Sequence, residues 1–187
     1  MLKALFVRPS IGKSTVIMHH GLSSVKEEWD PLIEELAKNG LGVFAYDARP
    51  AGTPWQKLVD DMGAAVRSLE TTYSIDRKKV ILAGASLGAN VCLKYAALTN
   101  NGAAILLLSP GLNYQGLTTT DVAGQIKKTP ILIIAHPADG YAFKSSRELT
   151  PLIPTGQFWT STKPGHGVQM FDEDLLRKIS SWLNDPK

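Results

Sequence analysis

Short apolar runs alternate with longer amphipathic stretches along this chain. The short runs are rich in β-branched residues and cover residues 2–7, 15–19, 41–46, 80–83, 104–108, 131–135 and 157–161. Between two of these runs, apolar residues recur at helical spacing, at Leu58, Met62, Ala65, Val66 and Leu69. Such alternation is typical of βαβ units, in which helices cover both faces of a mostly parallel sheet. The pattern therefore predicts a three-layer α/β/α fold with about seven strands.

The first two strands are separated by a segment with turn composition, Pro9-Ser10-Ile11-Gly12. A short turn favours an antiparallel hairpin, so we expect the first strand to be antiparallel and to pair with the second. Ser24 is followed by Glu27 at the spacing of a capping box, which predicts a helix that begins at Ser24. Further helices are expected near residues 89–98, 121–127, 143–152 and 170–183.

The length and composition of the chain limit the classes of protein it can belong to. With 187 residues and no repeat or linker, residues 1–187 are expected to form one domain. The net charge is +3 and the basic residues are scattered, so no nucleic-acid surface is expected. No apolar run approaches the roughly 20 residues of a membrane span, and no signal-peptide core is found. We expect a cytoplasmic protein with no membrane partner, in which the single cysteine, Cys92, is buried by packing.

The segment Gly84-Ala85-Ser86-Leu87-Gly88 follows an apolar run and precedes a helical stretch. In a G-x-S-x-G turn the serine hydroxyl projects away from the sheet, and glycines two residues to either side leave the space that the turn needs. The helix that follows directs N–H groups and the positive end of its dipole at the serine. The pattern predicts Ser86 as a nucleophile. The alternative is a closely packed strand-to-helix turn without chemistry.

A serine hydroxyl needs a neighbouring base to act as a nucleophile at neutral pH. Of the four histidines, His166 is the best candidate, because glycine on both sides lets its loop reach across the end of the sheet. In the chain order Ser, acid, His, the available acids are Asp121, Asp139 and Glu148. Asp139 lies in a loop after an apolar run, whereas helix capping explains Asp121 and a helical face explains Glu148. We predict a triad of Ser86, Asp139 and His166, with a surface histidine and a turn-forming aspartate as the alternatives.

Acyl transfer also needs hydrogen-bond donors for the oxyanion. The N–H of Leu87, directly after the nucleophile, is one candidate. The N–H of Leu22 is the other, because Gly21 lets the backbone after the second strand approach a substrate. The remaining candidates for substrate contact are His20, Gly21, Tyr114 and Tyr141, with Trp55 and Leu112 as further lining side chains.

Together these motifs resemble the α/β-hydrolase superfamily over nearly the whole chain, in the style of its compact dienelactone-hydrolase-like and small carboxylesterase branches. The resemblance rests on His20-Gly21, Asp47-Ala48-Arg49, the 84–88 turn, the Asp139 loop and Gly165-His166-Gly167. It implies a Ser-His-Asp triad, no organic cofactor and no metal. Cap domains of this superfamily follow the strand that corresponds to residues 104–108, and only residues 109–118 are available here. No cap domain is therefore expected, and the site should be open and take small acyl groups.

This chain departs from the superfamily pattern at two positions. Pro50 occupies a position that is often glycine, which changes the backbone of the loop after Asp47. Dienelactone hydrolases carry cysteine where Ser86 stands, which argues against that specific activity.

The resulting prediction is a serine hydrolase that cleaves small carboxylic esters, with a small-molecule acyl substrate as its partner. Thioester or peptide cleavage would use the same triad. A hydrolase-like binding protein that retains an idle triad is the alternative from another class, because fold does not imply function. Activity is expected to fall on acidification as His166 becomes protonated.

Overall fold

The computed structural model describes residues 2–186. A seven-stranded sheet runs through these residues, in the strand order β1-β3-β2-β4-β5-β8-β9. Its strands are β1 (Ala4–Val7), β2 (Thr15–His19), β3 (Gly42–Tyr46), β4 (Val80–Ala85), β5 (Ile105–Leu108), β8 (Ile131–Ala135) and β9 (Gly156–Thr160). Only β1 is antiparallel to its neighbour, and the other six strands are parallel. The predicted fold class is confirmed.

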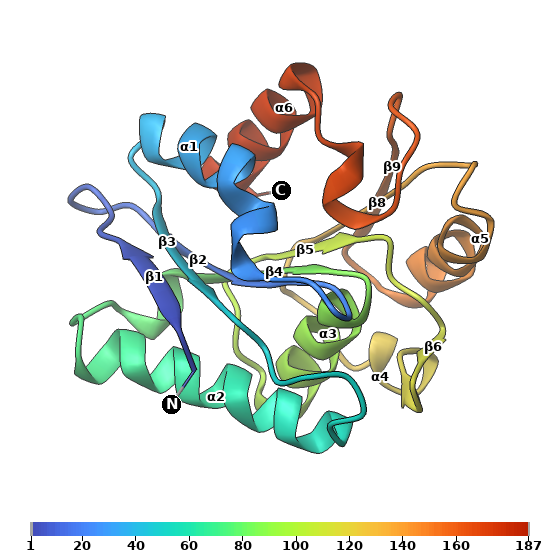
Figure 1. Ribbon diagram of the computed structural model, residues 1–187, viewed down its shortest axis with the longest axis horizontal. Helices are drawn as coiled ribbons and strands as arrows, with labels where there is room; N and C mark the ends of the chain where they lie inside the picture. Colours follow the sequence, from blue (N-terminus) through green and yellow to red (C-terminus); the bar gives the residue numbers. More distant parts are fainter. Residues whose placement is uncertain (1, 187) are drawn as a thin grey trace.

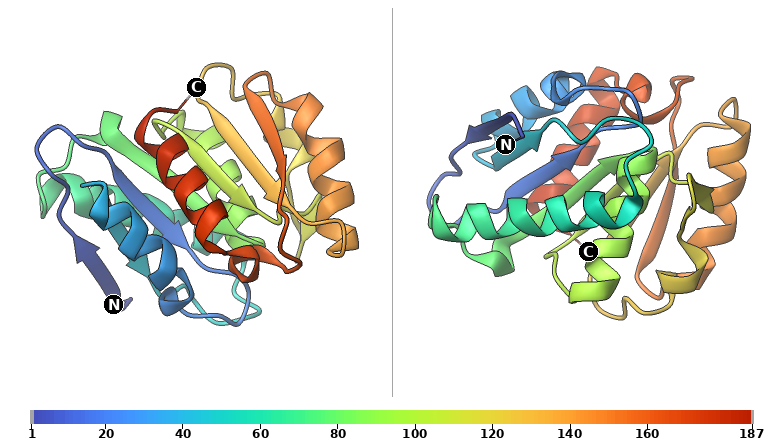
Figure 2. Two further views of the ribbon diagram at one scale, coloured as in Figure 1. Left: turned by 90° about the horizontal axis from the view of Figure 1, so that it is seen from above. Right: turned by 60° about the horizontal axis from the view of Figure 1, so that its bottom comes forward.

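Helices cover both faces of the sheet (Figure 1). On one face lie α1 (Asp30–Lys38) and α6 (Glu173–Asn184), and on the other lie α2 (Trp55–Thr71) and α3 (Leu87–Thr99). The helix α5 (Gly140–Leu149) packs beside β8, toward the end of the sheet opposite β1 (Figure 2). Because the central strands are covered twice, their residues are buried at every position and separate two apolar cores, one on each face.

The predicted hairpin between the first two strands is wrong. The strand β1 pairs with β3, with Ala4 opposite Tyr46 and Val7 opposite Val43. The crossover through α1 places β3 parallel to β2, so β3 occupies the position that the hairpin would have given to β1. The connection from β1 runs beside the start of β3, where the Ser10 N–H donates to the Gly40 carbonyl at 2.9 Å.

The helix start predicted at Ser24 is also wrong. A 3-10 helix, η1 (Lys26–Trp29), precedes α1. Its N-cap residue is Val25, which provides no side-chain capping bond. The Ser24 hydroxyl instead donates a hydrogen bond to the carboxylate of Glu28. The capping-box spacing was therefore misleading, because Ser24 bonds a side chain four residues ahead.

The remaining elements are short. They are the 3-10 helices η2 (Arg77–Lys79), η3 (Thr150–Leu152) and η4 (Gly167–Met170), the strands β6 (Asn113–Tyr114) and β7 (Leu117–Thr118), and the helix α4 (Thr120–Ala123). The strands β6 and β7 form a small hairpin in the segment between β5 and α4. This segment holds no cap domain, in agreement with the prediction.

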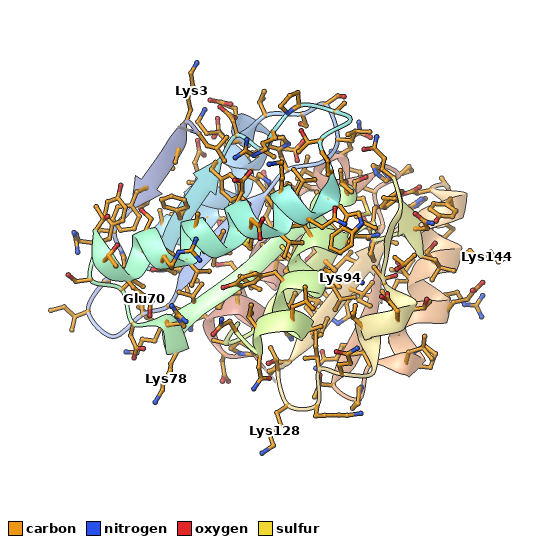
Figure 3. The ribbon with its side chains drawn as sticks, turned by 90° about the horizontal axis from the view of Figure 1, so that it is seen from below. Lys3, Glu70, Lys78, Lys94, Lys128 and Lys144 are labelled. Atoms are coloured by element: carbon orange, nitrogen blue, oxygen red, sulfur yellow. The ribbon has the colours of Figure 1, made fainter. Side chains whose placement is uncertain are left out.

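Basic side chains project from separate parts of the molecule, as Lys3, Lys78, Lys128 and Lys144 do in Figure 3. Cys92 is buried inside α3, and burial raises the pKa of its thiol well above the ordinary value. Among residues 2–186, no helix is both long enough and apolar enough to cross a bilayer.

Candidate active site

Ser86 stands at the turn between β4 and α3, with φ 55° and ψ −121°. A residue with a side chain rarely adopts this backbone conformation, and such strain persists only where the surroundings hold it. The Ser86 N–H donates to the carbonyl of Leu108 on the neighbouring strand β5 at 2.8 Å. The turn presents the half-buried Ser86 side chain at the carboxyl end of the sheet.

The two glycines that flank this turn, Gly84 and Gly88, are required because there is no space for a side chain at either position. A Cβ atom on Gly84 would lie 2.3 Å from the Gly88 carbonyl oxygen. A Cβ atom on Gly88 would lie 2.3 Å from the His19 carbonyl oxygen and 2.6 Å from that of His20. These neighbours are backbone atoms and have little freedom to move. Gly84 and Gly88 therefore leave the space that the turn needs, as predicted from the sequence.

Asp139 and His166 meet across two loops. Asp139 precedes α5 after β8, and His166 precedes η4 after β9. The His166 Nδ1 atom lies 2.6 Å from the Asp139 Oδ2 atom, and the carboxylate is the more buried partner, 15% exposed against 41%. In a neutral imidazole that donates its Nδ1–H to this carboxylate, Nε2 is left with a free lone pair. That lone pair is what a general base needs.

Ser86 and His166 line one open cavity of about 350 Å³. Its other walls come from the loop after β2, from Glu28 on η1 and from residues 167–169. The structure brings the three predicted triad residues to one end of the sheet. Among the described residues there is no hydrogen bond between Ser86 and His166, and the Tyr114 hydroxyl donates to the Ser109 carbonyl at 3.3 Å.

The two residues that carry the predicted oxyanion donors line the same hollow. Leu22 and Leu87 line a narrow hollow together, and neither N–H donates to an acceptor among residues 2–186. The Gly21 N–H, by contrast, donates to the Glu28 carboxylate at 3.1 Å. Glu28 therefore holds both Gly21 and Ser24, at the two ends of the loop that carries Leu22.

Both ring nitrogens of His20 have hydrogen-bond partners within the protein. Its Nδ1–H donates to the Gly21 carbonyl at 2.7 Å, and its Nε2 accepts from the Ala48 N–H at 2.8 Å. Both ring nitrogens are occupied and the residue is buried, although His20 lines the narrow hollow with Leu22 and Leu87, so its contact with substrate stays a prediction. The ring joins the loop after β2 to the loop after β3.

Tyr114 lies against the catalytic candidates, and Tyr141 lies behind it. The Tyr114 ring is edge-on to that of His166 at 6.5 Å and to that of Tyr141 at 5.6 Å. Burial first, and the Asp139 carboxylate second, raise the pKa of Tyr114 well above its ordinary value, while its interaction with Ser86 lowers it. The phenol is therefore a neutral hydrogen-bond donor at neutral pH.

Three other candidates lie elsewhere in the fold. Trp55 faces the ammonium group of Lys94 at 5.3 Å instead of lining the cavity (Figure 3 labels Lys94). Asp121 does not cap α4, because the N-cap position is occupied by Thr119, which makes no side-chain capping bond. Asp121 instead forms an ion pair with Lys94 at 2.6 Å. Leu112 contributes no side chain to the cavity that holds Ser86.

Two residues near the site were missed by the sequence reasoning. Ser109 is fully buried with φ 50°, and its hydroxyl accepts a hydrogen bond from the Gly167 N–H at 2.9 Å. It thereby supports the residue next to His166. Glu28 was overlooked because Glu27 matched the capping-box spacing. No local signal distinguishes either residue from an ordinary loop serine or surface glutamate.

Comparison with known proteins points to hydrolases. The profile of the family described as "Serine aminopeptidase, S33" matches residues 11–138, more than half of the chain. The uncharacterised protein YfhR of Salmonella typhimurium is 32% identical over 91 residues, which are 46% of this chain and 31% of that protein. The chain thus matches about a third of the length of this curated relative.

Solved structures share the fold at low sequence identity. A dienelactone hydrolase from Anabaena variabilis has a TM-score of 0.82 at 18% identity, over 97% of this chain and 90% of that one. A carboxylesterase from Bacillus cereus has a TM-score of 0.76 at 17% identity, over 98% and 93% of the two chains. An esterase from Pyrococcus furiosus has a TM-score of 0.78 at 20% identity, over 98% and 91%. These likenesses show the α/β-hydrolase fold.

Proposed function

Because the chain belongs to the family described as "Serine aminopeptidase, S33" and has the α/β-hydrolase fold, we propose that it is a serine hydrolase that cleaves small carboxylic esters. The observation that carries this proposal is the 2.6 Å contact between His166 and Asp139, with His166 and Ser86 in the wall of one cavity. Ser86 is the nucleophile, His166 the base, and Asp139 the residue that orients and stabilises the imidazolium.

In the first half of the reaction, the Ser86 Oγ atom attacks the acyl carbon and its proton passes to His166 Nε2. The N–H groups of Leu22 and Leu87 hold the oxyanion of the tetrahedral intermediate. When the intermediate collapses, the ester C–O bond breaks and the alcohol leaves with the proton from His166. Water then attacks the acyl carbon while His166 removes its proton, the bond between the acyl carbon and Ser86 Oγ breaks, the carboxylic acid leaves, and His166 returns the proton to Ser86. Neither N–H group has an acceptor within residues 2–186, which supports their assignment to the oxyanion.

Labelling with a fluorophosphonate probe tests the proposal directly. The wild-type protein should react covalently, and Ser86→Ala should abolish both the labelling and the hydrolysis of p-nitrophenyl acetate. Ser181→Ala is the matched control, because Ser181 is exposed on α6, away from the cavity. If the folded wild-type protein is not labelled, or if Ser86→Ala is labelled equally, the chain is better described as a hydrolase-like binding protein.

Thioester and peptide cleavage proceed through the same acyl-enzyme and need their own measurement. Rates on an acyl thioester and on an aminoacyl p-nitroanilide, measured with the ester rates, rank the three bond types. The ester proposal requires kcat/KM to be highest on the oxygen ester for the same acyl group. A higher value on the anilide would assign the enzyme to peptide bonds.

A further inference from the structure

Gly21 and Leu22 line two hollows that differ greatly in size. The cavity lined by Ser86 and His166 has a volume of about 350 Å³. The hollow lined by Leu22, Leu87 and Gln115 has a volume of about 10 Å³. A volume of about 10–15 Å³ accommodates a single water-sized group. Because Leu22 borders both, an ester whose carbonyl oxygen is held at the Leu22 N–H has room for a large group in one hollow and for a very small group in the other.

The β6–β7 hairpin fills the narrow side. The Tyr114 ring lies edge-on to that of His166 at 6.5 Å, yet Tyr114 is absent from the wall of the large cavity. Gln115, at the turn of the hairpin, reaches the hollow beside Leu22 and Leu87. Gln115 thus narrows the hollow beside Leu22 and Leu87, and Tyr114 borders the site beside His166.

The hairpin is held in this position by buried hydrogen bonds. Asn90 on α3 is fully buried, accepts from the Gly111 N–H at 3.1 Å and donates to the Leu117 carbonyl at 3.0 Å. The Tyr114 ring packs against Gly111, where an added Cβ atom would lie 2.7 Å from it. The Tyr114 hydroxyl also lies 3.3 Å from the Ser109 carbonyl oxygen. Because both ends of the hairpin are bonded to the body of the protein, the narrow side is a fixed wall.

The position of His166 indicates which half of the ester occupies which side. The leaving oxygen must receive a proton from the imidazole, so the alcohol lies on the side of the His166 loop. Residues 166–169 form a wall of the large cavity. The alcohol therefore occupies the large cavity, and the acyl group is directed toward the hairpin.

Resting on the proposed function, we propose that this enzyme cleaves esters of the smallest carboxylic acids, with acetate as the upper size limit, and that Tyr114 and Gln115 set this limit. The alcohol can be large, because it occupies the open 350 Å³ cavity. The substrate class is thus acetyl esters of bulky alcohols.

The test compares kcat/KM on p-nitrophenyl acetate, butanoate and hexanoate. One methylene too many changes specificity by roughly 10–200-fold in a tight pocket, so the wild-type enzyme should prefer acetate to butanoate by at least about tenfold. Gln115→Gly removes the side chain at a residue with φ 51°, where glycine is favoured, so the fold is retained. This variant, and Tyr114→Ala independently, should raise the butanoate-to-acetate ratio by about tenfold. Ser74→Gly, also at positive φ (59°) but in the turn after α2, should leave the ratio unchanged.

A second series varies the alcohol while the acyl group stays acetyl. The ratio of kcat/KM on phenyl acetate to that on naphthyl acetate should be the same in the wild type and in both hairpin variants, whatever the change in absolute rate. A wild-type profile that is flat from acetate to hexanoate overturns the inference, as does a widening of the alcohol range without a change in the acyl range. Both results leave Ser86-dependent hydrolysis intact. Absence of fluorophosphonate labelling and of hydrolysis on every ester would instead overturn the proposed function, and this inference with it.

Discussion

Buried His19 should make the folded protein less stable in mild acid. It ends β2, is 2% exposed, and its Nδ1 atom lies 2.9 Å from the His20 carbonyl oxygen. Its Nε2 atom has no hydrogen-bond partner among residues 2–186. Burial lowers the pKa of His19 from 6.5 to about 4, although the His20 carbonyl and Asp61 act in the opposite direction.

The pKa difference sets the size and direction of the effect. Between about pH 6.5 and pH 4, the unfolded chain binds a proton at His19 that the folded protein does not bind. The free energy of unfolding therefore falls as the pH is lowered through this window. Above the window His19 is neutral in both states, and the folded protein has its full stability. At 1.36 kcal/mol for each pKa unit, the total loss is about 3 kcal/mol.

Urea unfolding of the wild type and of His19→Asn at several pH values between 7 and 4.5 measures this contribution. Asparagine keeps a short amide donor near the His20 carbonyl but does not titrate. The variant loses packing at every pH, so the informative quantity is the change in the wild-type-minus-variant difference. That difference should shrink by about 2–3 kcal/mol on acidification, because only the wild type carries a titrating imidazole at residue 19. Parallel pH curves for the two proteins would refute the reasoning.

Two further substitutions test the backbone around the site. Gly88→Ala should destabilise the fold by about 1–3 kcal/mol or more in thermal unfolding, because the new methyl group meets two backbone carbonyls. The matched change Gly63→Ala in α2 meets only side-chain atoms at 3.3 Å and 3.5 Å, so it should be neutral or stabilising by up to about 1 kcal/mol; equal losses in both variants would contradict the steric argument. Ser109→Ala leaves the Gly167 N–H without its acceptor and should cost about 1–3 kcal/mol and lower kcat on p-nitrophenyl acetate. Unchanged stability and kcat in this variant would show that Ser109 does not support the His166 loop.

The fold class was predictable because strand and helix periods are local properties of the chain. The apolar runs at β4 and β8 are buried at every position, as parallel strands covered on both faces require. The partner of β1 was not predictable in this way. A short connection favours a hairpin only when the neighbouring position is free, and the crossover through α1 had already placed β3 beside β2.

The convergence of Ser86, Asp139 and His166 at one end of the sheet could be anticipated because each follows a parallel strand, and such strands end at the same edge. Glu28 and Ser109 follow no such rule. Glu28 accepts a hydrogen bond from the Gly21 N–H, which lies in the preceding loop. Ser109 accepts one from the Gly167 N–H, which is distant in the sequence. Serine and glutamate are common in loops, so their identity carries no information about which N–H they bind. Candidate catalytic residues can be found from strand ends and from the glycines that a closely packed turn requires, whereas residues that hold those loops in place become visible only when the loops are packed together.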